Sequence, residues 1–368
     1  MESDLPMNLF EKGSQNQDLS TIKKDAEGEK DFLDVLKMIA PGTSLRTALD
    51  DLLRAGMGAL IVIDNGEINN VYERGFKIYS KFSSQKLIEL GKMDGAIILS
   101  RNAKKILHAN TTLHPDQTIM SKETGTRHKS AERTSKQTGA IVIAISERKN
   151  KITIYYGGIK HELRDSAEIL RRAAENLQIL EKQREAFNEA INNLNLLEFK
   201  RMVTMKDVSL VIQKFEILKR TSDVVKRYLV ELGKEGMIVS LRLKDLTLGL
   251  DKEEEFILKD YFPDTEFVTK ILGKMDPDFL LEASNISRVV FEELHDKPLS
   301  PKGYRMLSKL NILDRHIDAL VGRFKNLDNL LFASDMDLLD VFKNEGLVSF
   351  FREEIYSLRE KVKVGKQI

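Results

Sequence analysis

Three short polar clusters in the first half of the chain have residue types suited to binding phosphate or transferring it. In the first, Asp94 supplies a carboxylate next to Gly95, whose missing side chain would let a ligand approach the backbone. In the second, a glycine loop runs into the expected start of a helix near His128, where free N–H groups together with Arg127 and His128 would bind polyphosphate. In the third, Ser146 ends an apolar strand, and strand ends are where α/β sheets bind ligands.

Each cluster also has an ordinary structural explanation. Asp94 and Gly95 would make a simple turn, and Ser146 would only mark the point where a strand leaves the core. The basic helix start is harder to explain in this way, because Arg127, His128 and Lys129 lie at the positive end of the helix dipole. A bound anion would compensate them, so this cluster favours a phosphate ligand.

Motifs of several other functional classes are missing from the sequence. It contains no G-x-x-x-x-G-K-[ST] phosphate loop and no H-E-x-x-H zinc motif, and Gly56 and Gly58 lack the third glycine of a dinucleotide fingerprint. The absence of cysteine excludes disulfides, thiolate zinc sites and a cysteine nucleophile, and it fits a reducing compartment. The six histidines are scattered, so the sequence identifies no set of metal ligands.

The bulk properties suggest a multidomain protein away from membranes. A chain of 368 residues with 42% hydrophobic residues suggests two or three domains. The net charge of +1 favours neither nucleic acid nor an anionic membrane. The longest apolar stretch, around Ala59 to Ile63, is far shorter than the ~20 residues of a membrane span. With no signal-peptide pattern at the N-terminus, we expect a cytoplasmic protein.

The pattern of elements predicts an α/β domain followed by helices. Residues 1–30 are polar and are expected to form an N-terminal extension. In residues 31–162, short β-branched runs alternate with helical stretches, which predicts a central mixed sheet. The expected strands are 59–63, 96–99, 140–145 and 152–156, and the expected helices between them are 85–90 and 128–136.

The second half of the chain is predicted to be all-helical. In a connector at 163–298, apolar residues recur at steps of three and four, with an interruption at Arg184. They are Leu170, Ala173, Leu177, Leu180, Phe187, Ile191 and Leu194. This seam should pack on residues 208–232, and it fits a hairpin within the chain as well as it fits an oligomer scaffold. Residues 299–368 read as a small domain of short helices.

Taken together, the three clusters resemble the diadenylate cyclase domain family, which has D-G-A and R-H-R signatures. The matching segments are Asp94-Gly95-Ala96, Arg127-His128-Lys129, Ala40-Pro41-Gly42-Thr43, Gln137-Thr138-Gly139-Ala140 and Ile145-Ser146-Glu147-Arg148. Leu197-Glu198-Phe199 and the stretch from Leu299 to Arg305 look like the DNA-integrity scanning members of that family. The similarity covers roughly residues 31–368 and is strongest over 40–160.

The resemblance implies an enzyme that joins two ATP molecules into cyclic di-AMP and releases two pyrophosphates. Each 3′-hydroxyl would attack the α-phosphate of the other ATP across a two-fold interface between facing catalytic domains. By matched position, Asp94, Arg127 and His128 are implied to be catalytic. Nucleotide binding is implied for Asp94, Gly95, Ala96, Leu113, Thr126, Arg127, His128, Lys129, Ser130 and Ser146. Mg²⁺ or Mn²⁺ is implied as cofactor, and an octamer as the homo-oligomer.

Two departures from the family pattern affect the expected function. Lys129 replaces the second arginine of R-H-R and loses its planar two-point grip, so we expect an active enzyme that could be slower. In residues 299–368 the family carries helix-hairpin-helix elements with a G-I-G-like turn, whereas the matching stretch here has Glu345 and Gly346. This segment has 12 Lys and Arg against 10 Asp and Glu, a balance of only +2. DNA is therefore a possible partner with weakened binding.

Two other functions remain open at this point. A degenerate cyclase domain could sense ATP or cyclic di-AMP without turnover, and Lys129 favours that possibility. A structural, DNA-scanning protein could work mainly through its helical region, although the missing hairpin glycines argue against it.

Overall fold

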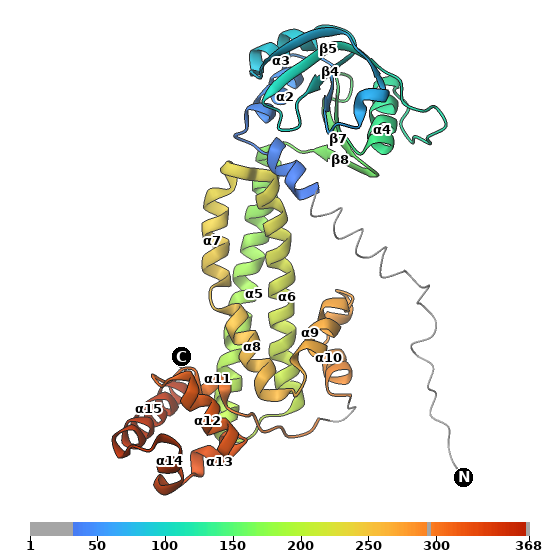
Figure 1. Ribbon diagram of the computed structural model, residues 1–368. Coiled ribbons are helices and arrows are strands. Elements are labelled where there is room, and N and C mark those ends of the chain that lie inside the picture. The colour runs from blue at the N-terminus through green and yellow to red at the C-terminus, as the bar shows by residue number, and fades with distance from the viewer. Residues whose placement is uncertain (1–31, 293–295, 366–368) are drawn as a thin grey trace, which may run out of the picture. The chain divides into compact units, whose positions relative to one another are not determined.

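The computed structural model describes residues 32–292 and 296–365, and the predicted N-terminal extension lies outside these residues (Figure 1). The described chain forms two compact units. The first contains the residues up to 171 together with Tyr228–Met237, and the second contains Arg172–Arg227 together with the residues from 238 onward.

The first unit is built on a mixed sheet of eight strands, which confirms the predicted fold class. The strands are β1 (Leu60–Ile63), β2 (Tyr72–Glu73), β3 (Phe76–Lys81), β4 (Ala96–Leu99), β5 (Lys105–Leu113), β6 (Ile141–Ser146), β7 (Lys151–Tyr156) and β8 (Ile159–Leu163). Their order is β2-β5-β4-β1-β6-β7-β8, and β3 also pairs with β5. β1 and β4 run parallel, whereas the other pairings are antiparallel.

Helices cover both faces of this sheet, because the central strands are apolar on both sides. Ile61 and Ile63 of β1 pack in one core with residues 32–39, α2 (Ser44–Arg54) and α3 (Ser84–Gly91). Leu60 and Val62 point the opposite way, into a second core that includes Ala131 of α4 (Thr126–Thr138). Figure 1 shows α2 and α3 on one side of the sheet and α4 on the other.

The second unit is helical. Its long helices are α5 (Ser166–Lys200) and α6 (Met205–Leu232), and α7 (Met237–Thr247), α8 (Leu250–Tyr261), α9 (Thr265–Lys274) and α10 (Ala283–Val290) follow. Rings of Phe187 on α5 and Phe215 on α6 lie 6.1 Å apart, which confirms that the predicted seam packs on residues 208–232. Leu170, predicted to belong to the seam, is exposed, whereas its neighbour Ile169 is buried. α5 runs through Arg184 without a break.

Five shorter helices complete the second unit. They are α11 (Tyr304–Leu307), α12 (Asp314–Phe324), α13 (Leu327–Phe332), α14 (Asp335–Phe342) and α15 (Glu345–Lys363). Their core includes Phe199 from the end of α5. Arg305 on α11 is fully buried, and its guanidinium pairs with Glu198 of α5 at 2.7 Å. None of the described helices combines the length and apolar content that crossing a bilayer would need.

Candidate active site

The strand register brings the predicted polar clusters to one end of the sheet. Leu60 pairs with Ala96 in parallel and with Ala144 in antiparallel orientation, so β1 and β4 start where β6 ends. β5 ends at the same place, because its Thr111 pairs with Ala96. The segments just beyond these pairs therefore meet at one edge, and they contain Gly58, Asp94, Gly95, Leu113 and Ser146.

A tight turn holds Asp94 at this edge. Gly95 has a φ of +87°, and a side chain there would meet the Thr111 carbonyl oxygen at 2.8 Å, so only glycine fits. The next residue, Ala96, is fully buried, and its carbonyl accepts a 2.7 Å hydrogen bond from the Thr111 hydroxyl. Asp94 is exposed. The backbone is thus fixed up to the residue that carries the carboxylate, which faces solvent.

The start of α4 lies beside this edge, because the helix packs on β6 and β7. Its N-cap is Gly125, which supplies no side-chain hydrogen bond, and the first turn contains no acidic residue. Thr126 and Arg127 are exposed there. The helix therefore begins with free N–H groups and an uncompensated positive end, which suits a phosphate group.

Arg127 connects α4 to the first strand. A Cβ at Gly58 would overlap Nη1 of Arg127 and lie 3.0 Å from its Cζ, so the guanidinium lies directly over the Gly58 backbone. Ile145 donates its N–H to the Ala59 carbonyl at 2.8 Å, which places Ser146 at the same level of the sheet. The Arg127 guanidinium is therefore positioned over the strand ends.

Tyr155 of β7, Lys160 of β8 and Glu123 of the loop before α4 lie around His128. Its ring lies edge-on to that of Tyr155, with 6.4 Å between centroids. The Tyr155 hydroxyl donates to Glu123 at 3.0 Å, and Lys160 pairs with the same Glu123 oxygen at 2.6 Å. Burial, with help from Lys149 and other nearby cations, lowers the pKa of His128, although Glu123 opposes that effect. His128 is therefore neutral near pH 7.

The outer face of α4 fixes the loop that precedes the helix. Glu132 accepts a 2.5 Å hydrogen bond from Ser121, Arg133 donates to the Ile119 carbonyl at 2.9 Å, and Lys136 donates to the Met120 carbonyl at 3.0 Å. These three side chains form a stripe that clamps the loop, and the loop in turn leads directly to the N-terminus of α4.

Lys129 lies on this clamping stripe and not beside Arg127. It precedes Glu132, Arg133 and Lys136 by three, four and seven positions, which puts all four on one helix face. Arg127 instead precedes buried Ala131 by four positions and shares the sheet-facing side. The substitution at 129 therefore affects a side chain about 160° around the helix from the one that lies over Gly58.

The site residues differ in how closely the fold gathers them. Asp94, Gly95, Ala96, Ser146, Thr126, Arg127 and His128 come together at one sheet end, and half-buried Ser130 follows Arg127 by nearly one turn. Half-buried Leu113 lies one strand farther out, paired with Tyr72. The sequence did not reveal Gly58, Glu123 or Tyr155 as part of the site, because each looks like an ordinary strand or loop residue.

The donor set suits a cation held mainly by a ligand's phosphates. Among the described residues, no three His, Asp or Glu side chains are grouped as a metal cage. Mg²⁺ commonly uses phosphates, waters and one or two carboxylates, and exposed Asp94 is a carboxylate available for that role.

Comparisons with known proteins agree on one family. Residues 46–160 match the model described as the DisA bacterial checkpoint controller nucleotide-binding region, and residues 163–292 match the DisA bacterial checkpoint controller linker region. DNA integrity scanning protein DisA of Clostridium kluyveri is 42% identical over 93% of this chain and 99% of its own length. The proteins of that name from Acetivibrio thermocellus and Clostridioides difficile are 43% and 40% identical, over 86% and 92% of this chain and 91% and 98% of their own lengths.

Proposed function

The chain belongs to the family of DNA integrity scanning proteins with a diadenylate cyclase domain, and from this we propose that it condenses two ATP into cyclic di-AMP. The main structural support is the meeting of Asp94 with the uncapped start of α4 at one sheet end. A carboxylate can act on the attacking hydroxyl, and a helix start with free N–H groups can bind the triphosphate.

In the proposed reaction two phosphodiester bonds form and two phosphoanhydride bonds break. Each 3′-oxygen attacks the α-phosphorus of the other ATP, and each bond between the α-phosphorus and the bridging oxygen breaks to release pyrophosphate. The protein does no covalent chemistry of its own, so positioning and charge stabilisation carry the rate enhancement.

Asp94 is proposed to accept the proton of the attacking 3′-hydroxyl or to orient that hydroxyl. Its carboxylate is exposed at the sheet edge, on a backbone that Gly95 and Thr111 hold in place. A Mg²⁺ or Mn²⁺ ion bound by Asp94 and the ATP phosphates would supply neutralising charge for the leaving pyrophosphate.

The start of α4 is proposed to hold the triphosphate. The free N–H groups at Thr126 and Arg127 and the Arg127 guanidinium present several donors to phosphate oxygens. His128, whose pKa is lowered by burial, would be a hydrogen-bond partner for the phosphates. Ser130 and Ser146 flank this position, and Leu113 would contact the adenine.

A two-fold assembly is part of this proposal. Asp94, Thr126 and Arg127 are exposed, so a single domain presents an open half-site. Cyclic di-AMP is two-fold symmetric, and a second copy facing the first would supply the same groups to its other half. An octamer, as the family resemblance implies, would contain four such pairs.

The test of this function is ATP turnover by the full chain with Mg²⁺ or Mn²⁺, with cyclic di-AMP measured by mass spectrometry. We expect product from the wild type and a loss of at least about 10²-fold in Asp94→Asn, because the proton acceptor is removed. Asp51→Asn is the matched control, since Asp51 pairs with Arg54 on α2, away from the sheet end that holds Asp94.

The other outcomes of this experiment are informative. Saturable ATP binding without any product would overturn the cyclase proposal in favour of a nucleotide sensor, and Lys129→Arg would then be tested for restored turnover. Equal losses in Asp94→Asn and Asp51→Asn would remove the proposed role of Asp94.

We also propose that DNA binding by the C-terminal helices is weak. The hairpins α12–α13 and α14–α15 turn at Lys325 and Lys343, with φ of 64° and 55°. An asparagine caps the second helix of each, with Asn326 accepting from the Asn329 N–H and Asn344 from the Leu347 N–H. These caps occupy N–H groups that would otherwise be free for DNA phosphates.

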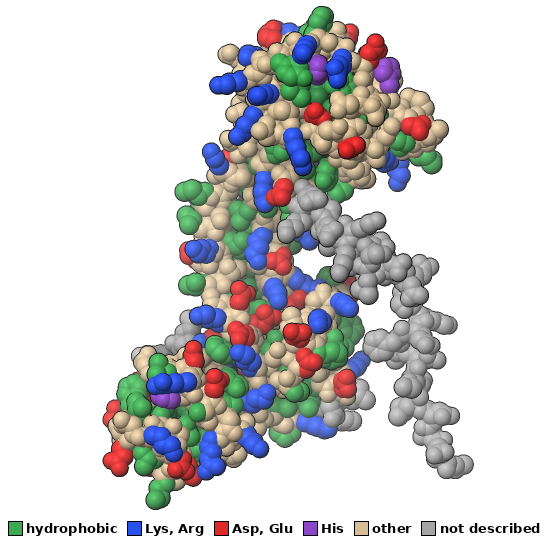
Figure 2. Space-filling model, in the orientation of Figure 1, with side chains coloured by type: hydrophobic (Ala, Val, Ile, Leu, Met, Phe, Trp, Pro, Cys, Tyr) green, Lys and Arg blue, Asp and Glu red, His purple; other side chains and the backbone are tan. Residues whose placement is uncertain are grey.

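The charge pattern supports the same proposal. An acidic residue lies in the first turn of the second helix of each hairpin, Asp328 in α13 and Glu345 in α15. Basic and acidic side chains are mixed on the visible face of the helical unit in Figure 2. We expect fluorescence anisotropy with branched DNA to give micromolar or weaker affinity in physiological salt. Nanomolar affinity would contradict the proposal.

A further inference from the structure

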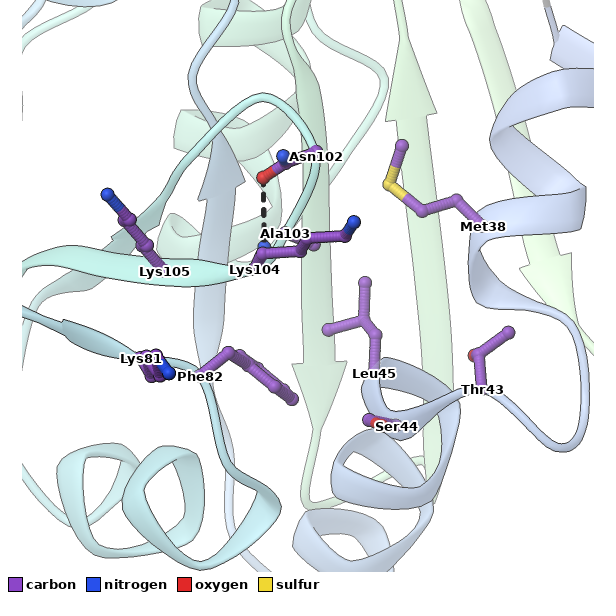
Figure 3. A pocket seen from close by; sticks show the side chains of 10 residues that line it. All are labelled: Met38, Thr43, Ser44, Leu45, Lys81, Phe82, Asn102, Ala103, Lys104 and Lys105. Atoms are coloured by element: carbon purple, nitrogen blue, oxygen red, sulfur yellow. Dashed lines mark hydrogen bonds between the residues drawn. The ribbon is translucent and has the colours of Figure 1, made fainter.

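A cavity of 520 Å³ lies in the first unit, at the end of the sheet opposite to Asp94 (Figure 3). It is lined by Asn102 and Ala103, which follow the last residue of β4, whereas Asp94 precedes the first. The helical residue Met38 and the start of α2 form the opposite wall. Its volume falls in the range of small-molecule sites.

The cavity is strongly basic. Lys81, Lys104 and Lys105 line it, and none of the described residues in its wall is acidic. Nor does any of these three ammonium groups form an ion pair with another residue that the structure describes. Lys86 adds a fourth cation nearby, because its Nζ lies 3.3 Å from the Lys81 carbonyl oxygen.

Several other lysines of the same unit are paired with a carboxylate. Lys92, Lys136 and Lys151 each contact a glutamate at 2.6 to 2.7 Å. Like charges that are gathered without a counter-charge repel one another, so a cluster of free lysines around a concavity favours an anionic ligand.

Two helix starts add to the positive potential. α2 and α3 begin next to each other, since the Ser84 hydroxyl of α3 donates to the Ser44 carbonyl of α2 at 3.2 Å. Neither helix has an acidic residue in its first turn. Thr43 and Ser83 cap these helices by accepting from the Arg46 and Lys86 N–H groups, so the helix starts contribute the positive end of their dipoles and not those N–H donors. Thr43 and Ser44 are part of the cavity wall.

The rest of the wall is apolar. Leu45, Phe82 and Met38 supply it, and Figure 3 shows the Phe82 ring directed toward Leu45 and the Lys104 side chain extended toward Met38. A bare inorganic ion would leave these surfaces unfilled. A ligand with one anionic and one apolar end would match both halves of the cavity.

We propose that this cavity binds a small phosphorylated molecule carrying an aromatic group. The phosphate would lie beside Lys104 near the start of α2, with Lys81 and Lys105 adding positive charge at the rim, and the ring would pack on Phe82 and Leu45. The site is separate from the proposed ATP site, because the two lie at opposite ends of β4.

Pyridoxal 5′-phosphate is a suitable probe, because it combines a phosphate, an aromatic ring and an aldehyde that marks nearby lysines. The aldehyde condenses with a lysine amine to an imine and releases water, and added borohydride delivers hydride to the imine carbon while solvent protonates the nitrogen. Peptide mass mapping of the full chain then locates the label.

We expect the extent of labelling at the cavity lysines, Lys81, Lys104 or Lys105, to be at least about 10-fold higher than at Lys252, which is exposed on α8. Excess inorganic phosphate should suppress that label, and pyridoxal without its phosphate should show no preference. Uniform labelling of cavity lysines and Lys252, or labelling that phosphate does not reduce, would overturn the proposal.

A variant tests the site by equilibrium binding. Lys104→Gln should weaken reversible pyridoxal 5′-phosphate binding at least about 10-fold, because one charged contact is lost. Lys92→Gln, which removes a surface lysine outside the cavity, should leave it unchanged. ATP turnover should be the same in both variants and the wild type. Equal probe affinity in Lys104→Gln and the wild type would exclude the cavity as the binding site.

Discussion

Replacement of Gly58 by alanine tests whether the position of Arg127 matters for turnover. A Cβ at Gly58 would overlap the Arg127 guanidinium, and no backbone atom is among the three nearest neighbours. Since Gly58 has no positive φ, alanine is conformationally acceptable there. The arginine side chain is flexible, so the expected response is a displaced guanidinium in an otherwise intact fold.

The size of the effect follows from that overlap. Ordinary contact between heavy atoms begins at about 3.5 Å, so the guanidinium must move by about 1 Å or more. A misplacement of that size costs on the order of 10²-fold in rate. Stability should hold or rise by about 0.4–1 kcal/mol, because alanine restricts the unfolded chain.

The assay is cyclic di-AMP production by Gly58→Ala, Arg127→Ala and the double variant, with thermal unfolding of each. If Gly58 acts through Arg127, the double variant should be no slower than Arg127→Ala alone. Gly158→Ala is the matched control, because a side chain there meets no atom within 4 Å. Wild-type turnover in Gly58→Ala, or additive losses in the double variant, would refute this reasoning.

Three further predictions concern other parts of the chain. Lys129→Arg should change turnover by less than about 3-fold, whereas Arg127→Lys should lower it at least about 10-fold; a large gain from Lys129→Arg would contradict the assigned helix faces. Burial, with nearby cations, lowers the pKa of His108 from 6.5. Below about that pH the unfolded chain therefore binds more protons than the folded chain, and the folded state loses stability as the pH is lowered. The midpoint temperature of unfolding should decrease as the pH goes from about 7 to about 5.5, and this decrease should be smaller in His108→Asn. In urea unfolding, Arg305→Met should lose about 3–5 kcal/mol, and Glu198→Leu added to it should recover part of that loss; no recovery would mean that the unpaired carboxylate is not the cause.

The elements that sequence patterns predicted best are those with strong apolar runs. β1 and β4 are buried along their whole length, and each was recognisable as a short β-branched run. β5 was missed because Lys105, Asn110 and two threonines dilute its apolar pattern, and its place in the sheet depends on partners far along the chain. Packing between distant segments overrides local composition in such strands.

Residues of the candidate site could be predicted from the sequence only where they belong to a recognisable motif. Asp94, Arg127 and His128 stand in recognisable signatures, and the strand register shows why they are near one another. Gly58 and Tyr155 have no such signal, because their roles arise from close approach to a side chain on α4. A glycine in the sequence indicates where the backbone turns, but the sequence around it does not indicate which distant side chain packs over that turn.

The burial of Arg305 limits how this protein could be divided in evolution or in the laboratory. Its guanidinium, on α11, pairs with Glu198 of α5, and the backbone N–H groups at Gly303, Tyr304 and Arg305 all donate to Asp260 of α8. If the last seventy or so residues were excised, the Arg305 guanidinium would go with the excised fragment and lose its counter-ion, and Glu198 in the remaining chain would lose its partner. The core that Phe199 completes would also be exposed. The C-terminal helices are therefore not a transferable module, and a fusion or truncation that preserves them should retain α5 and α8 as well.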